Sequence, residues 1–288
     1  MRYSQLRAFD AVARCLSFSR AAEVLGVTQP AVSLQVAALE RSYRTDLLAR
    51  HGARISLTGD GEALFVLTRQ MFSAEAEIED FLTSSEKLQR GHLRFGADGP
   101  HIALDLVAAY RAKYPAITLE LVLGNATQTW NAVLQSVVDI AVLANPPEDP
   151  RLGYLPLAAQ NMMLLVPREH AFARRKEIGL AEIGNAPVIF REHDSNTQRT
   201  LEAKLRKLEL TLRPVLIVGS REAMVEAVSR QIGLGFIFSR EKNEDPRSIA
   251  IPIRDLKSSS KNMLVYLKPR RRRRTVAALL EIAGKMRR

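Results

Sequence analysis

The sequence lacks most of the residues and motifs that an enzyme or a metalloprotein would need. Cys15 is the only cysteine, so the chain can form neither an internal disulfide nor a cysteine-based metal site. The five histidines show no metal-ligand spacing. There is no GxSxG nucleophile elbow and no GxxxxGK phosphate-binding loop. We therefore expect no catalytic residues, no metal and no cofactor.

Long hydrophobic runs are also missing. No segment approaches the ~20 apolar residues that span a bilayer, and the first residues are amphipathic rather than a basic stub followed by an apolar stretch. Hydrophobic residues make up 47% of the chain and charged residues 25%, which is ordinary for a globular protein. We expect a cytoplasmic protein of two or three domains without membrane attachment.

The net charge of +11 is unevenly distributed. Residues 1–57 carry a net +4, residues 58–90 a net −4, and residues 268–288 a net +8. A basic excess favours a polyanionic partner. The run Arg270–Arg274 has two interpretations: a second nucleic-acid or phosphate patch, or a solvated edge where the last strand meets the final helix. The second is favoured, because the run lies far from the N-terminal block in the expected layout.

The first 58 residues are expected to form a winged helix-turn-helix. Gly26 ends a second helix, and Thr28 is a suitable N-cap for a third, with Pro30 just inside its start. Two helices joined by a turn that contains glycine are typical of a helix-turn-helix. Residues 46–57 are partly β-like and predict the small hairpin of a wing.

Residues 59–90 are expected to form one long linker helix capped by Thr58. Its apolar residues repeat at heptad spacing, which favours a coiled-coil seam between two copies of the chain. The alternative is a helix packed on its own domain. The seam is favoured because the outer faces are rich in acidic and polar residues. The two heptad sets are Leu64, Met71, Ile78 and Ser85, and Leu67, Ala74, Phe81 and Leu88.

From Gly91 onward, short apolar runs alternate with helical patterns, which predicts an α/β domain with mostly parallel sheets. Two such sheets indicate two lobes, with lobe I at about 91–161 and 268–288 and lobe II at about 162–267. A small ligand is expected between them. The expected strands are Leu93–Ala97, Thr118–Leu123, Ile140–Leu143, Met162–Val166, Val188–Phe190, Val215–Val218, Leu234–Phe238 and Met263–Leu267. The expected helices are 101–113, 126–136, 196–209, 221–231 and 275–287.

The segment SFSRAAEVLGVTQPAVSLQ at residues 17–35 strongly resembles the LysR-type transcriptional regulators. Leu39-Glu40, the stretch Leu47–Arg50 and the stretch Leu57–Gly61 continue the resemblance. The resemblance implies a winged helix-turn-helix, a linker helix and a two-lobed α/β effector domain like periplasmic binding proteins. It further implies a homodimer paired through linker helices and a tetramer, bound to double-stranded promoter DNA. The resemblance also implies that an effector between the lobes alters transcription, and RNA polymerase is a candidate partner.

Two positions depart from the pattern of many family members. Leu34 stands where many carry arginine, so one potential DNA contact is missing. Tyr43-Arg44 replaces Leu-Gly before the wing, which places a basic residue at a less tight turn.

The second half is similar to a LysR-type subgroup associated with aminoethylphosphonate catabolism. The similarity lies in GADGPH at residues 96–101, AVLANPP at 141–147 and GSRE at 219–222.

The third helix should lie in the major groove with its first residues at base edges. Gln29 can pair bidentately with adenine, and Ser33 can donate or accept one turn later. Positively charged side chains on the second helix and the wing would neutralise phosphates without reading sequence. The alternative for each arginine is a solvated surface charge. The candidate DNA-binding residues are Arg20, Thr28, Gln29, Pro30, Ser33, Gln35, Arg50 and Arg54.

Effector residues are expected beyond the C-terminal ends of strands, near helix N-termini that favour anions. A zwitterion such as 2-aminoethylphosphonate would place its anion at residues 195–197 and Arg221, and its amine at Asp98 or Glu222. The alternative is that these residues only cap helices. The candidates are Asp98, Pro100, His101, Asn125, Thr127, Gln128, Asn145, Ser195, Asn196, Thr197, Arg221 and Glu222.

Two further classes compete with a regulator. A transport-type binding protein would have similar lobes, but the helix-turn-helix and the missing secretion pattern argue against it. An enzyme on a two-lobed scaffold would need a nucleophile and a base in one motif, and the sequence shows none.

Overall fold

The computed structural model describes residues 2–51, 54–82, 91–241, 245–257 and 259–286. The chain forms two compact units, the first from Met1–Ser84 with Gln135–Val137 and the second from Ser85–Leu134 with Val138–Arg288. The mixed architecture of a helical N-terminal part followed by α/β lobes confirms the predicted fold class. No helix among the described residues is both long enough and apolar enough to cross a membrane.

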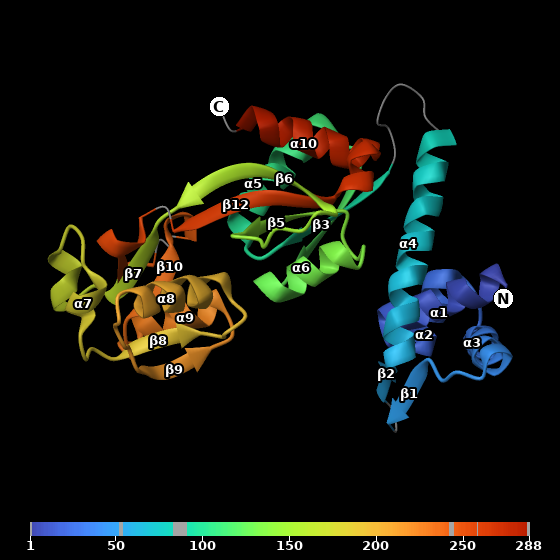
Figure 1. Ribbon diagram of the computed structural model, residues 1–288, viewed down its shortest axis with the longest axis horizontal. Coiled ribbons are helices and arrows are strands. Elements are labelled where there is room, and N and C mark those ends of the chain that lie inside the picture. The colour runs from blue at the N-terminus through green and yellow to red at the C-terminus, as the bar shows by residue number, and fades with distance from the viewer. Residues whose placement is uncertain (1, 52–53, 83–90, 242–244, 258, 287–288) are drawn as a thin grey trace. The chain divides into compact units, whose positions relative to one another are not determined.

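The first unit contains three short helices, a hairpin and a long helix (Figure 1). Ser17 caps the second helix by accepting a hydrogen bond from the backbone N–H of Arg20 at 3.3 Å. Gly26 ends that helix in the left-handed region at φ 66°. Thr28 begins the third helix from an extended conformation. The elements are α1 Tyr3–Cys15, α2 Phe18–Leu25, α3 Gln29–Tyr43, β1 Leu48–His51, β2 Arg54–Leu57 and α4 Gly59–Leu82.

Buried apolar side chains hold these helices together. Phe9 and Val12 of α1 pack against Val36 and Leu39 of α3, and all four are almost completely buried. These positions recur every three or four residues, so one face of each helix points to the core. The predicted helix-turn-helix therefore has the required packing.

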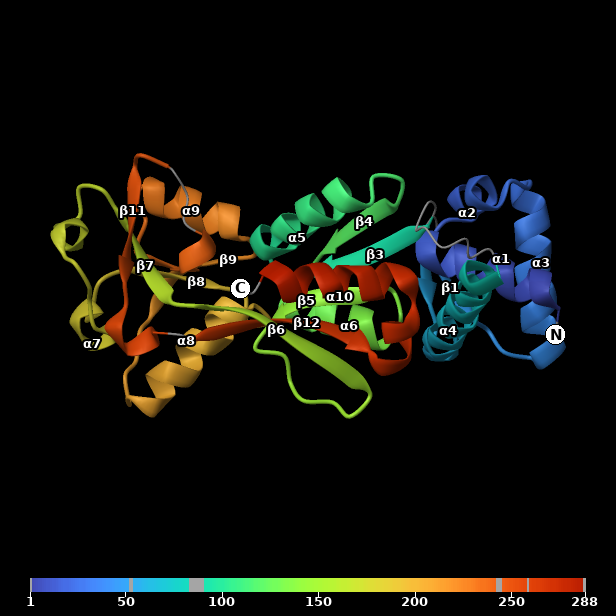
Figure 2. The ribbon, with the colours of Figure 1, turned by 90° about the horizontal axis from the view of Figure 1, so that it is seen from above.

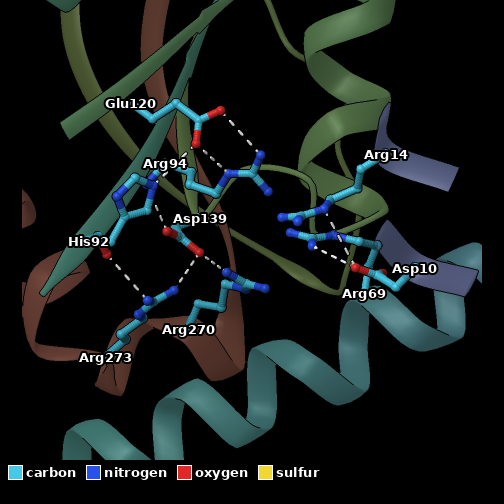
Figure 3. Close-up of polar contacts among 9 residues, drawn as sticks. All are labelled: Asp10, Arg14, Arg69, His92, Arg94, Glu120, Asp139, Arg270 and Arg273. Atoms are coloured by element: carbon cyan, nitrogen blue, oxygen red, sulfur yellow. Dashed lines mark hydrogen bonds and ion pairs between the residues drawn. The ribbon is translucent and has the colours of Figure 1, made fainter. Parts of the chain in front are cut away.

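The long helix α4 is anchored to α1 by polar contacts. Thr68 donates to Asp10 at 3.1 Å, and Arg69 lies 3.6 Å from the same carboxylate (Figure 3). The Tyr3 hydroxyl donates to Glu75 at 2.6 Å. These contacts fix α4 to its own unit between residues 68 and 75. The helix is described to Leu82, so the last heptad positions expected to extend it, Ser85 and Leu88, lie outside the described residues.

Lobe I of the second unit is a five-stranded sheet in the order β4-β3-β5-β12-β6. Two helices cover one face and one helix covers the other, as Figures 1 and 2 show. The strands are β3 His92–Ala97, β4 Thr118–Leu123, β5 Ile140–Ala144, β6 Leu152–Gln160 and β12 Ser260–Leu267. The helices are α5 Pro100–Lys113 and α10 Arg274–Met286 on one face and α6 Ala126–Leu134 on the other, with the 3-10 turn η4 at Lys268–Arg272.

Lobe II is built around β7, which lies between β10 and β11. A parallel pair, β8 and β9, joins β10 through a bridge between Val188 and Leu234. Helix α8 packs on one face and α9 on the other. The elements are β7 Met162–Pro167, η1 Ala171–Arg174, α7 Leu180–Ile183, β8 Val188–Arg191, α8 Asn196–Lys207, β9 Pro214–Val218, α9 Arg221–Ser229, β10 Gly235–Phe238, η2 Ser239–Glu241, β11 Ser248–Pro252 and η3 Arg254–Leu256.

Two expectations about the sheets were wrong. The sheets are mixed rather than mostly parallel, because β12 runs antiparallel to both β5 and β6, and β7 runs antiparallel to β10 and β11. Strand β12 was placed in lobe II, but it pairs inside the sheet of lobe I. The chain therefore returns to lobe I before residue 260 rather than at residue 268. Strands β6 and β11 were not predicted.

The arginine run is divided between the interior and the surface. Arg270 and Arg273 both pair with the buried carboxylate of Asp139, the latter at 2.6 Å, and Asp139 also accepts from the backbone N–H of Arg94 at 2.9 Å (Figure 3). Arg271 and Arg272 are exposed. Two of the five arginines therefore belong to the packing of lobe I, so for these two both interpretations, the nucleic-acid patch and the solvated edge, were wrong.

Candidate functional site

The exposed surface of α3 contains most of the expected DNA-binding residues. Thr28, Gln29 and Pro30 are exposed at the helix start. Ser33 is half-buried one turn later. Arg20 is exposed on α2. These residues lie on the two helices of one helix-turn-helix, as the sequence predicted.

The remaining DNA candidates are less open. Gln35 accepts a hydrogen bond from the Ser4 hydroxyl at 3.2 Å, so its amide oxygen is already engaged. Arg50 and Arg54 occupy the two antiparallel strands of the hairpin, opposite Ile55 and His51 respectively. The side chains of both arginines lie outside the described part of the chain. Their strand positions match the expected wing.

The two departures from the family pattern are both at the surface. Leu34 is 62% exposed on α3, next to Ser33, so it contributes nothing to the core. Arg44 ends α3 in the left-handed region at φ 52°, where glycine is more usual. The turn therefore forms without glycine, and Arg44 remains exposed.

A cavity of about 450 Å³ lies between the two lobes of the second unit. This volume is within the range of small-molecule sites. Ten of the twelve expected effector residues line it: Asp98, Pro100, His101, Asn125, Gln128, Ser195, Asn196, Thr197, Arg221 and Glu222. Polar residues that follow strands were expected to converge at one edge of the sheets, and most of the residues chosen in this way line the cavity.

The two other candidates, Thr127 and Asn145, are not in the cavity lining. The Thr127 hydroxyl donates to Asp194 of lobe II at 3.1 Å. The Asn145 amide donates to Asn196 at 3.3 Å and accepts from the backbone N–H of Lys261 at 2.8 Å. Both residues thus connect the lobes beside the cavity. They were expected in the effector site because they also follow strands.

Four helices begin at the cavity. Asn125 caps α6 by accepting from the backbone N–H of Gln128 at 2.9 Å. Ser195 caps α8 and Ser220 caps α9, each through a bond of 3.1 Å. Gly99 precedes α5 without a side-chain cap. Helix N-termini carry partial positive charge, so together they favour an anion in the cavity. The capping role considered for Asn125 and Ser195 is real, and both residues line the cavity as well.

Two acidic side chains at the cavity have raised pKa values. Burial raises the pKa of Asp98 to about 6, against the opposing effect of a hydrogen bond from the backbone N–H of Ala144. Burial also raises the pKa of Glu241, which accepts from the backbone N–H of Phe238 at 3.0 Å. Perturbed acids in a cavity are typical of functional sites.

The basic groups of the cavity include unsatisfied nitrogens. Nη1 of Arg221 and Nε2 of His101 are buried and have no hydrogen-bond partner among the described residues. Burial and the neighbouring Arg221 charge lower the pKa of His101. Buried polar atoms normally have partners, so these atoms indicate a place for a ligand or water.

Several lining residues were missed by the sequence reasoning. Glu241 and Arg240 follow β10, so the rule that selected Asp98 would also have selected them. Gln160 and Asn262 gave no such signal, since they meet only where β6 and β12 pair. Gln160 donates to Asn262 at 2.7 Å. The other polar side chains missed are Arg191 and Glu192. No cluster of potential metal ligands is found within the described ranges.

Comparison with known proteins identifies the family. Residues 3–62 match the model of bacterial regulatory helix-turn-helix proteins of the lysR family, and residues 86–287 match that of the LysR substrate binding domain. The chain belongs to the LysR-type transcriptional regulators. It binds DNA through the first match and has an effector-binding domain in the second.

Individual relatives agree with this assignment. The transcriptional activator CmpR of Synechocystis sp. is 27% identical over 81% of this chain and 77% of its own. A CbbR regulator of Sinorhizobium medicae is 30% identical over 81% of this chain and 75% of its own. A full-length OxyR from Pseudomonas aeruginosa shares the fold with a TM-score of 0.76 at 18% identity, covering 98% of this chain and 94% of that one. The LysR-type chain is a regulator and not an enzyme.

Proposed function

We propose that this LysR-type regulator binds promoter DNA in the cytoplasm and that a small anionic or zwitterionic effector in the interlobe cavity modulates this binding. The cavity carries the proposal, because four helix N-termini and the unpartnered Nη1 of Arg221 favour an anion, whereas the half-buried carboxyls of Asp98 and Glu241 favour a cation. A zwitterion meets both requirements. The resemblance to the aminoethylphosphonate subgroup makes 2-aminoethylphosphonate the first compound to test.

At the DNA, we propose that α3 reads bases and that arginines bind phosphates. Gln29 and Ser33 lie on consecutive turns of one helix, so they can reach neighbouring base edges in the major groove. Thr28 and Pro30 are proposed to position the helix start at the backbone. Arg20, Arg50 and Arg54 are proposed to contact phosphates, and these contacts do not depend on the base sequence of the DNA.

We further propose a homodimer paired through α4, assembling into a tetramer. Leu67 and Ile78 are each 60% exposed, and Met71 is 36% exposed on the same helix. Their heptad spacing places them on one stripe that the rest of the first unit leaves uncovered. A second α4 would bury this stripe. RNA polymerase is proposed as a further partner of the DNA-bound assembly.

A gel shift with the DNA upstream of the protein's own gene tests the proposal. We expect sequence-preferring binding at moderate salt and a changed mobility or affinity when 2-aminoethylphosphonate is added at millimolar concentration. Scrambled DNA of equal length and composition is the control. Equal binding to both DNAs would refute promoter recognition. Unchanged binding with the compound, together with no heat in calorimetry, would remove 2-aminoethylphosphonate as the effector.

A further inference from the structure

The four acidic side chains that line the cavity differ in their partners. Glu192 forms two bonds of 2.8 Å with Arg191, and Glu222 lies 3.2 Å from Arg221. Asp98 and Glu241, in contrast, each accept from a backbone N–H, at 2.8 Å and 3.0 Å. Neither has an ion pair within 4 Å among the residues that the structure describes. Both carboxyls therefore lack a direct ion pair, although Arg199 acts on Asp98 and Arg221 and Arg191 act on Glu241 from farther away.

Asp98 and Glu241 come from different lobes but lie close together. Asp98 follows β3 of lobe I, and Glu241 ends the turn η2 after β10 of lobe II. Oε1 of Glu241 lies only 3.9 Å from where a Cβ on Gly99 would be, one residue from Asp98. Their mutual repulsion adds to burial in raising the pKa of Asp98. Two like charges in a poorly solvated site disfavour each other unless a cation lies between them.

The cavity also has a basic side. Arg221 begins α9, where the helix N-terminus adds positive potential, and its Nη1 atom has no partner among the described residues. His101, in the first turn of α5, has an unpartnered Nε2. Arg221, His101, Asp98 and Glu241 line the same cavity, so one ligand can contact both the basic and the acidic groups.

We propose that the carboxylates of Asp98 and Glu241 bind a primary ammonium group of the effector, while Arg221 and His101 bind its anionic head. The inference rests on the proposed function, since it places the effector in the interlobe cavity. It replaces Glu222 by Glu241 as the amine partner. The Glu222 side chain is 73% exposed and already paired with Arg221, so it offers little to a buried ammonium.

Matched pairs of compounds test the ammonium group separately from the anion. The zwitterions are 2-aminoethylphosphonate, taurine and β-alanine, and their amine-free partners are ethylphosphonate, ethanesulfonate and propionate. Calorimetry and thermal shift on the full chain measure each pair. We expect at least one zwitterion to bind at least tenfold more tightly than its partner, because a charge-assisted contact of about 1.4 kcal/mol corresponds to tenfold. Equal affinities within every pair, or no binding of any zwitterion, would overturn the proposal.

Isosteric variants test the two carboxyls. Asp98→Asn keeps an oxygen that can accept from the N–H of Ala144, and Glu241→Gln keeps one for Phe238, so folding is expected to persist. Each variant should bind the zwitterion at least tenfold more weakly than the wild type does, and its affinity for the amine-free partner should change little. Glu169→Gln, at an exposed acid of lobe II, is the matched control. Variants that still prefer the zwitterion as strongly as the wild type would refute the ammonium site.

The melting temperature of the unliganded variant shows whether a loss of binding comes from unfolding. Because Asp98→Asn removes a half-buried charge beside Glu241, the melting temperature of the unliganded variant should equal or exceed that of the wild type. A melting temperature several degrees lower would show that Asp98 stabilises the fold and would count against the proposal. The gel shift with wild-type protein tests the proposed function by itself. Promoter binding that responds to a zwitterion, combined with variants of unchanged preference, would leave the proposed function standing and remove only the ammonium site.

Discussion

The buried carboxylate of Asp139 offers a sharp test of how the arginine run is used. Its Oδ1 atom accepts from Arg270 and Arg273, and its Oδ2 atom accepts from the backbone N–H of Arg94 at 2.9 Å. The side chains of Asp139 and Arg270 are only 4% and 5% exposed. In Asp139→Asn, one of these acceptors becomes an NH₂ donor that faces existing donors. The remaining contacts lose the negative charge that balances the guanidinium groups.

The expected loss of stability is large. Removing one partner of a buried ion pair costs about 3–5 kcal/mol, because the other charge remains buried. A destabilisation of 1 kcal/mol lowers the melting temperature of a unit of this size by about 2–4 °C. We therefore expect Asp139→Asn to lower the melting temperature of the second unit by on the order of 10 °C. Calorimetry of the full chain measures this, with the two units analysed as separate transitions.

Arg271→Ala is the matched control, since Arg271 lies in the same run but is exposed. A surface substitution of this kind changes stability by about 0.5 kcal/mol or less. A double variant of Asp139→Asn with Arg270→Met should lose less than the sum of the two single changes, because the two residues contact each other. If Asp139→Asn melted like Arg271→Ala, the buried network would contribute nothing and the division of the run would be wrong.

Three further predictions concern DNA, assembly and pH. Gln29→Ala should relax base preference in a gel shift, whereas Arg50→Ala should weaken binding to all sequences and reduce the salt slope by about one; an Arg50→Ala that changed only sequence preference would contradict the assigned roles. Leu67→Glu should dissociate the dimer in sedimentation, with Gln70→Glu on the same helix as control, and an intact dimer would exclude the α4 seam. Zwitterion affinity should fall by up to tenfold per pH unit below about 6, because Asp98, facing Glu241 and Arg199, becomes neutral there. The stability of the unliganded protein should depend on pH in the opposite direction, because the raised pKa of Asp98 makes the fold lose stability as pH rises toward 6. Calorimetry of zwitterion binding at pH 5 and 7.5 measures the predicted loss of affinity, and equal affinities at the two pH values would contradict it.

Local signals explain why most elements could be predicted from the sequence. The helix-turn-helix has its caps within the segment itself, so Ser17, Gly26 and Thr28 could be assigned without knowing the fold. The central strands are short, continuous apolar runs, and β5 and β7 are buried along their whole length. Such runs are readily recognised, because their flanking residues are polar.

The strands that were missed lie at sheet edges. Strand β6 is the last in the sheet of lobe I, contains Pro156 and has a mixed burial pattern. Proline is tolerated at an edge, where its missing N–H breaks no ladder, but it argues against a strand when only the sequence is known. Strand β11 is an edge strand of the three-stranded sheet of lobe II and ends at Pro252. The position of β12 was also unpredictable, since pairing with β5 joins residues more than 100 positions apart.

Thr127 and Asn145, which are not in the cavity lining, connect the two lobes beside it. Both residues follow strands, like the true lining residues, yet they bond to Asp194 and Asn196 across the lobes. Asn196 belongs to both groups, since it lines the cavity and its Oδ1 atom accepts from Asn145. A ligand shifts a conformational equilibrium only through contacts that differ between states. We expect an effector that bonds to Asn196 to alter its contact with Asn145, and with it one connection between the lobes.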